Sequence, residues 1–135
     1  MLRVRKAEAI QRLAYRLAAQ NDVRIYQYAN SGTHLHLLLR AKTHQGFKRF
    51  LRTLSALVPR IVTGAKKGMP ILGSRGAKSP ARKFWDGLAY TCVVNWGRHF
   101  FNGRYYVIRN ELEAEGLIPY RERKSRRAKQ APIRP

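Results

Sequence analysis

A predicted β-hairpin constrains the fold of this 135-residue chain more than any other feature. Residues Val23 to Ala29 alternate apolar and polar side chains, and Thr33 to Arg40 contain a run of leucines bounded by polar residues. The sequence Asn30-Ser31-Gly32 between them is typical of a turn. Two strands joined by so short a connection pair antiparallel, so the hairpin fixes the start of a sheet.

Three further segments have the apolar period of helices that pack on a sheet: Lys6 to Gln20, Thr43 or His44 to about Ile61, and Arg98 to Glu115 before Gly116. Pro59 should kink or weaken the second helix. The alternation in Trp85 to Val94 predicts a third strand in which Cys92 is a core residue. These elements predict an α+β fold, with helices packed against an antiparallel sheet in ferredoxin-like order.

The chain divides into one domain at 1–120 and a basic tail at 121–135, which we expect to be disordered. Within the domain, residues 64–83 hold four glycines, two prolines and six basic residues but no acid, which predicts a basic flexible loop. This loop is either a solvated linker or a segment that grasps a nucleic-acid strand. A single cysteine cannot form an internal disulfide, which favours a reducing compartment.

The charge of the chain is strongly positive, with 28 Lys and Arg against 7 Asp and Glu, a net +21. Such an excess predicts a polyanionic partner, and nucleic acid is the usual one. Omitting residues 121–135 still leaves +15. The bases are spread along the chain rather than along one amphipathic helix, which disfavours a membrane surface. No apolar run is long enough to span a bilayer or to act as a secretory signal, so we expect a cytoplasmic protein.

His34 and His36 are the first candidate site residues, because residues two apart in a strand share a face. Two imidazoles so placed can bind one divalent metal. Histidines in a strand can also be ordinary structural residues, so a functional site also requires a second half, with further catalytic and ligand residues elsewhere in the chain. That half is Tyr106, a candidate covalent nucleophile, with Asn110 four residues later on the same helix face as a carbonyl ligand. The neighbouring Tyr105 is the alternative nucleophile.

Other polar residues have a structural interpretation from sequence. His44 and His99 fall at helix starts and are interpreted as structural or DNA-facing residues. Glu111, Glu113 and Glu115 are predicted to form a solvated face that limits non-specific DNA binding.

A set of two histidines and one amide oxygen suits Mg²⁺ or Mn²⁺ on a substrate phosphate, or adventitious Zn²⁺.

With these motifs in order, Val23 to Tyr120 resembles the IS200-like and REP-associated tyrosine transposases, which are His-hydrophobic-His single-strand endonucleases. The similarity lies in His34-Leu-His36, the Trp-led segment Phe84-Trp85-Asp86 and the helix from Tyr106 to Asn110. Two departures are evident. Thr33 stands where the family usually has Asn. Only Leu2 to Arg5 offers the strand with which the family begins, so this first strand is expected to be short or missing.

The resemblance implies a DNA-binding transposase, acting in DNA transposition and recombination, that cuts single-stranded or hairpin DNA. Tyr106 would form a 5′-phosphotyrosine link and free a 3′-OH, with a divalent metal (Mg²⁺ or Mn²⁺) held by His34, His36 and Asn110. The chain is expected to bind nucleoid DNA and to form a homodimer. The alternative is a non-catalytic nucleic-acid-binding remnant or domesticated protein of the same fold. The basic residues expected to contact DNA are Lys48, Arg49, Arg52, Lys66, Lys67, Arg75, Lys78, Arg82 and Lys83.

Overall fold

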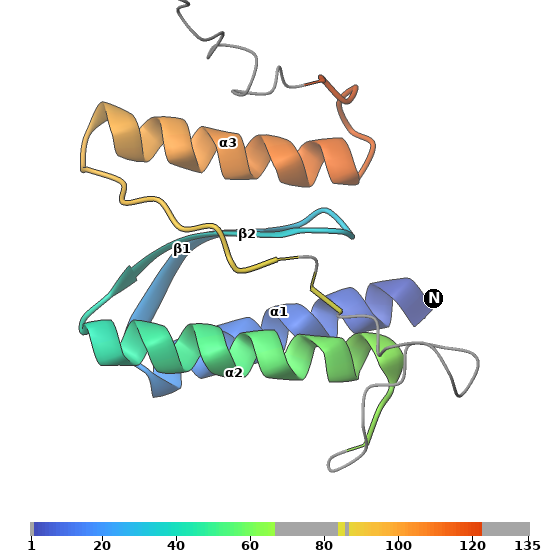
Figure 1. Ribbon diagram of the computed structural model, residues 1–135. Coiled ribbons are helices and arrows are strands. Elements are labelled where there is room, and N and C mark those ends of the chain that lie inside the picture. Colours follow the sequence, from blue (N-terminus) through green and yellow to red (C-terminus); the bar gives the residue numbers. More distant parts are fainter. Residues whose placement is uncertain (1, 67–83, 86, 123–135) are drawn as a thin grey trace, which may run out of the picture.

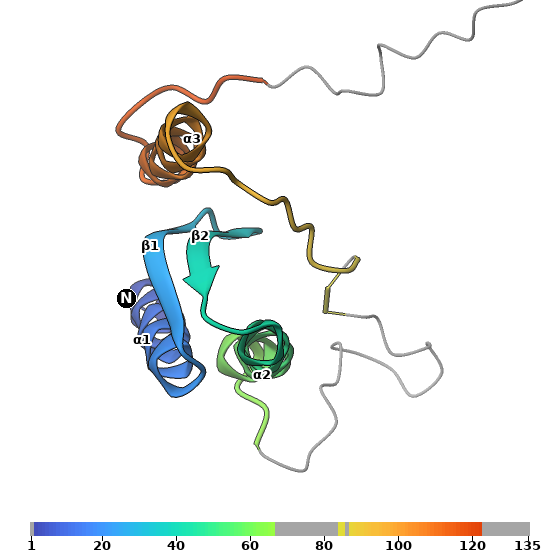
Figure 2. The same cartoon turned by 90° about the vertical axis from the view of Figure 1, so that its left-hand side faces the viewer.

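The computed structural model describes residues 2–66, 84–85 and 87–122. Its elements follow in the order α1 (Leu2–Gln20), β1 (Val23–Asn30), β2 (Leu35–Ala41), α2 (His44–Thr63) and α3 (Arg98–Ala114). They form three layers, with α3 on one face of the β1–β2 hairpin and α1 and α2 on the other (Figures 1 and 2). The predicted class is confirmed: the fold is α+β, with helices packed on an antiparallel sheet of few strands.

The hairpin contains a β-bulge that decides which side chains face which layer. The register shifts between Ile25 and Gln27, so β1 carries one residue more than its partner there. Simple alternation predicts Tyr26 and Tyr28 on one face, and this is wrong because the extra residue reverses the alternation. Tyr26 packs toward α3, whereas Tyr28 belongs to the core shared with α1 and α2.

The larger core lies between the hairpin, α1 and α2, and its largest fully buried side chain is Phe50. Its helical members recur at the predicted spacing: Ile10, Leu13, Ala14, Leu17 and Ala18 from α1, and Phe50, Leu54 and Val58 from α2. A smaller core between the hairpin and α3 contains Ala29, Leu38 and Val107. This smaller core sets the position of α3 over the strand that carries the histidines.

The ends of α2 follow ordinary capping rules. Thr43 is the N-cap, and its hydroxyl accepts a hydrogen bond from the Gly46 N–H at 3.0 Å. Gly64 ends the helix in the left-handed conformation at φ 73°, which glycine adopts without strain. Pro59 is buried within the helix, which continues to Thr63. The structure describes residues 64–66 of the predicted loop, while 67–83 of it and 123–135 of the tail lie outside the described residues.

The first strand, which the sequence predicts to be short or missing, is missing from the described residues. Residues 2–5 belong to α1, because nothing in the sequence interrupts the helix before Lys6 and an existing helix extends at low cost. The predicted third strand is wrong. The described residues of 85–94 form no ladder, although their sequence alternates as a strand does. Figure 2 shows most of this segment running apart from β2, although Val94 near its end packs on the small core, so the segment does not lie alongside a strand with which it could form a ladder. Cys92 is therefore exposed and not a core residue.

The described helices are also informative about membranes. None of the helices within the described part of the chain is long and apolar enough to cross a bilayer.

Candidate metal and nucleophile site

The two histidines of the predicted metal site lie together at the start of β2. His34 directly precedes the strand, and His36 is its second residue. Their rings are nearly parallel, with centroids 6.1 Å apart and planes 18° from one another. The shared face expected from a strand is thus present, and it is the face that α3 covers, since His36 also contacts Tyr106 of that helix.

Thr33 contributes an interaction that the sequence did not indicate. Its Oγ1 lies 2.7 Å from Nδ1 of His34. When the second nitrogen of a metal-binding histidine is hydrogen-bonded in this way, the ring is oriented and Nε2 is left to bind the metal. The residue that departs from the family pattern therefore contacts the site directly, and it orients one of the two imidazoles.

Tyr106 is the tyrosine that the fold brings to the histidines. Its ring meets that of His36 edge to face, with centroids 5.7 Å apart at 85°, although the two residues lie seventy positions apart in the sequence. The next residue, Val107, is buried against the hairpin and fixes this side of α3. Tyr106 is 43% exposed and Tyr105 66%, so Tyr105 projects further into solvent than Tyr106 does.

Asn110 lies one helical turn after Tyr106 and is buried, with 6% of its surface exposed. Its Nδ2 donates a hydrogen bond of 2.6 Å to the backbone carbonyl of Tyr106. This bond ties the amide nitrogen to the helix and so defines which end of the side chain is the oxygen. Oxygen is the atom that a hard divalent cation takes from an amide, so Oδ1 is the atom of Asn110 that could bind a metal.

The donor set suits a divalent metal in its chemistry. Metal–nitrogen bonds of about 2.1 Å at angles of about 90 to 110° place two imidazole centroids on one ion roughly 4.6 to 5.3 Å apart, so the rings at 6.1 Å would have to move closer together to bind one ion. Within residues 2–66, 84–85 and 87–122, no cluster of three or more His, Cys, Asp or Glu is placed to hold a metal. The candidate site therefore depends on the amide of Asn110 as its third ligand.

A groove of about 930 Å³ begins beside His34 and extends toward α1 and α2 rather than along Tyr106. Its walls come from the N-terminal half of α1, the hairpin turn, the C-terminal half of α2, the Phe84-Trp85 pair and the end of α3. Trp85 is held in this wall by a hydrogen bond of 2.8 Å from Nε1 to the carbonyl of Ser55. The groove joins His34 to an aromatic surface contributed by residues far away in the sequence.

Tyr28 forms part of the inner wall of the groove, and its chemistry is set by burial. The side chain is 6% exposed. Burial raises the pKa of the Tyr28 phenol to about 12, which the nearby Asn30 side chain only partly offsets. The carboxylate of Glu111 adds a small further increase to this pKa. Tyr28 is thus held neutral and is unsuited to act as a nucleophile.

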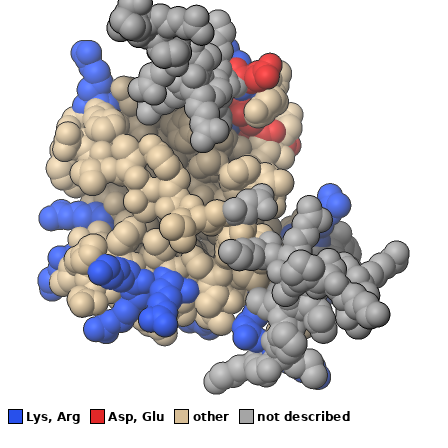
Figure 3. Space-filling model, in the orientation of Figure 1, with Lys and Arg blue, Asp and Glu red and all other residues tan. Residues whose placement is uncertain are grey.

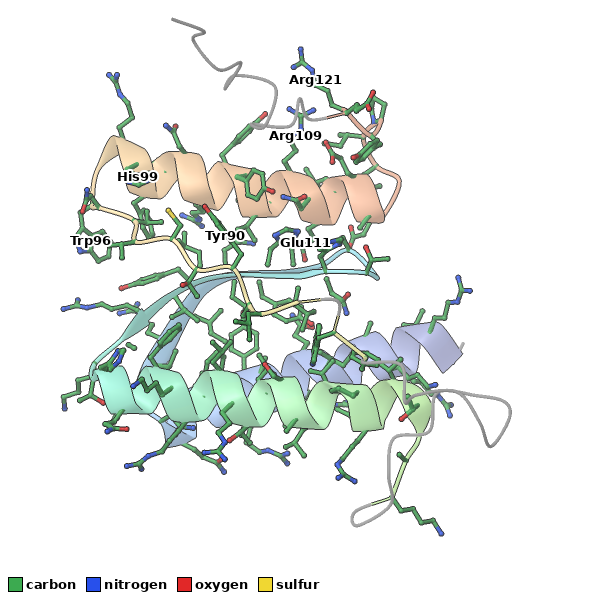
Figure 4. The ribbon with its side chains drawn as sticks, viewed as in Figure 1. Tyr90, Trp96, His99, Arg109, Glu111 and Arg121 are labelled. Atoms are coloured by element: carbon green, nitrogen blue, oxygen red, sulfur yellow. The ribbon has the colours of Figure 1, made fainter. Side chains whose placement is uncertain are left out.

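The acidic residues of α3 do not form one solvated face as predicted. The Glu113 side chain is 5% exposed and accepts a hydrogen bond of 2.8 Å from Nε of Arg109. Glu111 lies on the side of α3 toward the hairpin, and Arg109 lies on the other side (Figure 4). The spacing of four residues between Arg109 and Glu113 was the signal in the sequence for this pair.

The predicted DNA contacts on α2 are accessible. Lys48, Arg49 and Arg52 are all exposed. Figure 3 shows basic side chains along α2 and at the hairpin side, while acidic ones gather near the end of α3. Lys66 is exposed as well. The remaining predicted contacts lie outside the described residues: Lys67, Arg75, Lys78, Arg82 and Lys83.

The two other described histidines have the positions expected of them. His44 is the exposed first residue of α2. His99 lies in the first turn of α3, and its Nδ1 accepts a hydrogen bond of 3.2 Å from the Asn95 N–H. This bond fixes the entry to α3 and is structural.

Comparison of the chain with protein families, curated proteins and solved structures gave no significant match, so its functional interpretation rests on the geometry above.

Proposed function

We propose that this protein is a DNA-binding, metal-dependent single-strand endonuclease and strand transferase that uses Tyr106 as its nucleophile. The observation that carries the proposal is the contact between His36 and Tyr106, with His34 stacked beside them. A strand histidine pair and a helical tyrosine have no structural need to meet. The small core of Ala29, Leu38 and Val107 holds them together, which is the arrangement a preorganised site requires.

The proposed metal ligands are His34, His36 and Asn110, with Thr33 orienting His34. A bound Mg²⁺ or Mn²⁺ would polarise the scissile phosphate and offset the negative charge that develops on it. The three side chains leave ligand positions for phosphate oxygens, because they supply fewer donors than these ions require. Tyr106 would thereby have a phosphorus atom beside its hydroxyl oxygen.

The proposed reaction is a transesterification. The Tyr106 oxygen forms a bond to phosphorus while the bond from phosphorus to the 3′ oxygen breaks. The phenol proton passes to water, and the leaving 3′ oxygen takes up a proton to become a hydroxyl. The 5′-phosphotyrosine conserves the bond energy, so a 3′-OH of the same or another strand can reverse the reaction without ATP.

A covalent-adduct assay tests this proposal. Labelled single-stranded and hairpin oligonucleotides are incubated with the full chain and Mn²⁺, and the adduct is measured by denaturing electrophoresis. Tyr106→Phe should abolish the adduct but keep DNA affinity, because it removes only the attacking oxygen. Tyr105→Phe is the matched control and should retain the adduct. Loss of the adduct in the Tyr105 variant alone would move the nucleophile by one residue.

The alternative function, a non-catalytic nucleic-acid-binding protein of the same fold, is separated by the same assay. That function predicts DNA binding by the unaltered chain and no adduct with any oligonucleotide in Mn²⁺. The proposal also includes a cytoplasmic location on nucleoid DNA and a second copy of the chain as partner. Light scattering in moderate salt should give a mass near twice the 15.6 kDa of one chain. A single-chain mass with and without DNA would contradict the dimer.

A further inference from the structure

Two arginines lie directly opposite one another at the end of the hairpin remote from the histidines. Arg24 of β1 pairs with Arg40 of β2 in the register, and both side chains are exposed. Directly opposed residues on neighbouring strands are close, so two positive charges there destabilise the free hairpin. Within the described chain, no carboxylate forms an ion pair with either arginine. An anionic ligand would remove this repulsion.

The arginines line a shallow depression of about 240 Å³ together with Lys42, Ala41 and Asp22. Three bases face one acid there, so the depression keeps a net positive charge. The backbone N–H of Lys42 donates a hydrogen bond of 3.0 Å to the Asp22 carbonyl, which fixes this end of the hairpin. The depression is therefore a formed feature with room for a phosphate group.

An aromatic cluster adjoins the arginines. The guanidinium carbon of Arg24 lies 5.2 Å from the ring centroid of Tyr26. That ring contacts Trp96 at 5.7 Å and Phe100 at 5.3 Å, and Trp96 lies 4.8 Å from Phe100. Trp96 is 64% exposed, at the point where the chain enters α3 (Figure 4). A large aromatic ring that is fixed on one side and open on the other is suited to stack on an unpaired base.

The direction of β2 connects this cluster with the candidate catalytic site. His36 and Arg40 are four residues apart, so they share a strand face and lie about 13 Å from one another. A single nucleic-acid strand that follows β2 could thus place one phosphate at the histidines and another at the arginines.

We propose that Arg24, Arg40 and Lys42 bind a phosphate of single-stranded nucleic acid while Trp96 stacks on an adjoining unpaired base. The ligand class follows from the combination, since opposed guanidinium groups select an anion and the exposed indole selects a planar ring next to it. Arg24 and Arg40 lie on the strand face toward α3, whereas α2 with its basic residues lies on the other face of the hairpin. The site rests on the proposed function for the DNA strand that would run along β2 but needs neither the metal nor the nucleophile.

The test measures binding alone, in the full chain carrying Tyr106→Phe and in the presence of EDTA. A labelled single-stranded oligothymidylate is titrated at several salt concentrations. Arg24→Gln with Arg40→Gln is compared with Arg12→Gln with Arg16→Gln, which removes two exposed arginines of α1. Loss of two phosphate contacts should make the slope of log K against log salt shallower by about 1.4 in the first pair, and by less than half of that in the control.

Two further measurements do not depend on that comparison. Both pairs of substitutions lower the net charge by two, so both should raise the melting temperature at low salt. The first pair should raise it by more, because its two arginines are directly opposed on neighbouring strands. The oligonucleotide should quench tryptophan fluorescence in the parent chain and clearly less in Trp96→Phe, which retains Trp85. If the double variant is poorly folded, Arg40→Gln alone serves, with half of the expected change in slope.

The outcomes separate this inference from the proposed function. Equal losses in the two pairs of variants, or quenching that survives Trp96→Phe, would overturn the phosphate and base site while leaving catalysis open. An oligothymidylate site that behaves as expected in a chain that forms no adduct would uphold the inference alone. Nucleic acid would be overturned as the ligand if poly-glutamate bound through the same arginines with the same affinity as the oligothymidylate. Absence of any oligonucleotide binding would overturn it as well.

Discussion

Thr33 illustrates how one residue can change the interpretation of a motif. As a departure from the family pattern, it suggests a weakened site from sequence alone. In the fold its hydroxyl lies 2.7 Å from His34 Nδ1, so it is placed to orient that imidazole by a hydrogen bond of the kind that orients metal-binding histidines. The contact of His36 with Tyr106 could be predicted only through the resemblance, because the spacing of residues in the chain does not fix where α3 packs.

Thr33→Val provides a test of that contact, since it keeps the shape of the side chain and removes the hydroxyl. Loss of such an orienting bond typically costs 10- to 100-fold in metal affinity, so Mn²⁺ binding measured by calorimetry should weaken by about that factor. His34→Ala with His36→Ala should abolish the binding. Unchanged affinity in the double alanine variant would remove the histidines as ligands.

Tyr28 predicts a specific loss of stability at high pH. A raised pKa in the folded state means that its contribution to stability is fully present below the unfolded value near 10, and is lost as the pH rises toward about 12. The loss amounts to about 2 kcal/mol. Tyr28→Phe has no phenol to ionise, so its free energy of unfolding in urea should change less between pH 9 and 11.5. Parallel pH curves for the two proteins would contradict this assignment.

Among the elements, the helices were predictable and the third strand was not. Apolar period and caps identify α1, α2 and α3 because a helix satisfies its own backbone, so local sequence is informative. A strand depends on a partner that local sequence does not reveal, and 88–94 alternate without pairing in the described structure. The bulge in β1 escaped prediction for a related reason, because one extra residue leaves the composition unchanged but reverses the face of Tyr28.

The packing of α2 predicts that Gly46→Ala lowers stability, although helix propensity alone would predict that it raises stability. Alanine favours a helix by about 1 kcal/mol over glycine, yet a Cβ at this buried position would clash with the backbone carbonyl of Asn21. Gly46→Ala should therefore destabilise the protein by roughly 2 kcal/mol, as overpacking does.

Gly103→Ala in α3 is the matched control for this substitution. A Cβ there would meet the Leu38 and Val94 side chains at an ordinary 3.8 Å. The gain in helix propensity should thus remain, with stabilisation of about 0.5 to 1 kcal/mol in urea unfolding. Similar changes in stability for Gly46→Ala and Gly103→Ala would show that Gly46 of α2 does not lie as close to the Asn21 carbonyl as described.

At the scale of the whole molecule, the positive charge makes the stability of the free protein and its affinity for DNA respond to salt in opposite directions. A net +21 on 135 residues produces self-repulsion in the folded chain. Salt screens that repulsion, and it also weakens attraction to phosphates. The charge itself is visible in the sequence, but its arrangement is not, since the opposed Arg24 and Arg40 become evident only from the register of the hairpin.

The free protein should accordingly become more stable as salt rises, while its affinity for single-stranded DNA falls. With about six phosphate contacts, log K should decline against log salt with a slope near −4. Melting temperature and oligonucleotide affinity measured over the same salt series check both directions in one preparation. A chain ending at Tyr120 keeps +15 of the charge and should give a shallower slope. A slope near zero would mean that phosphates are not what the positive surface binds, and the proposals for the histidine site and the arginine site would both lose their substrate.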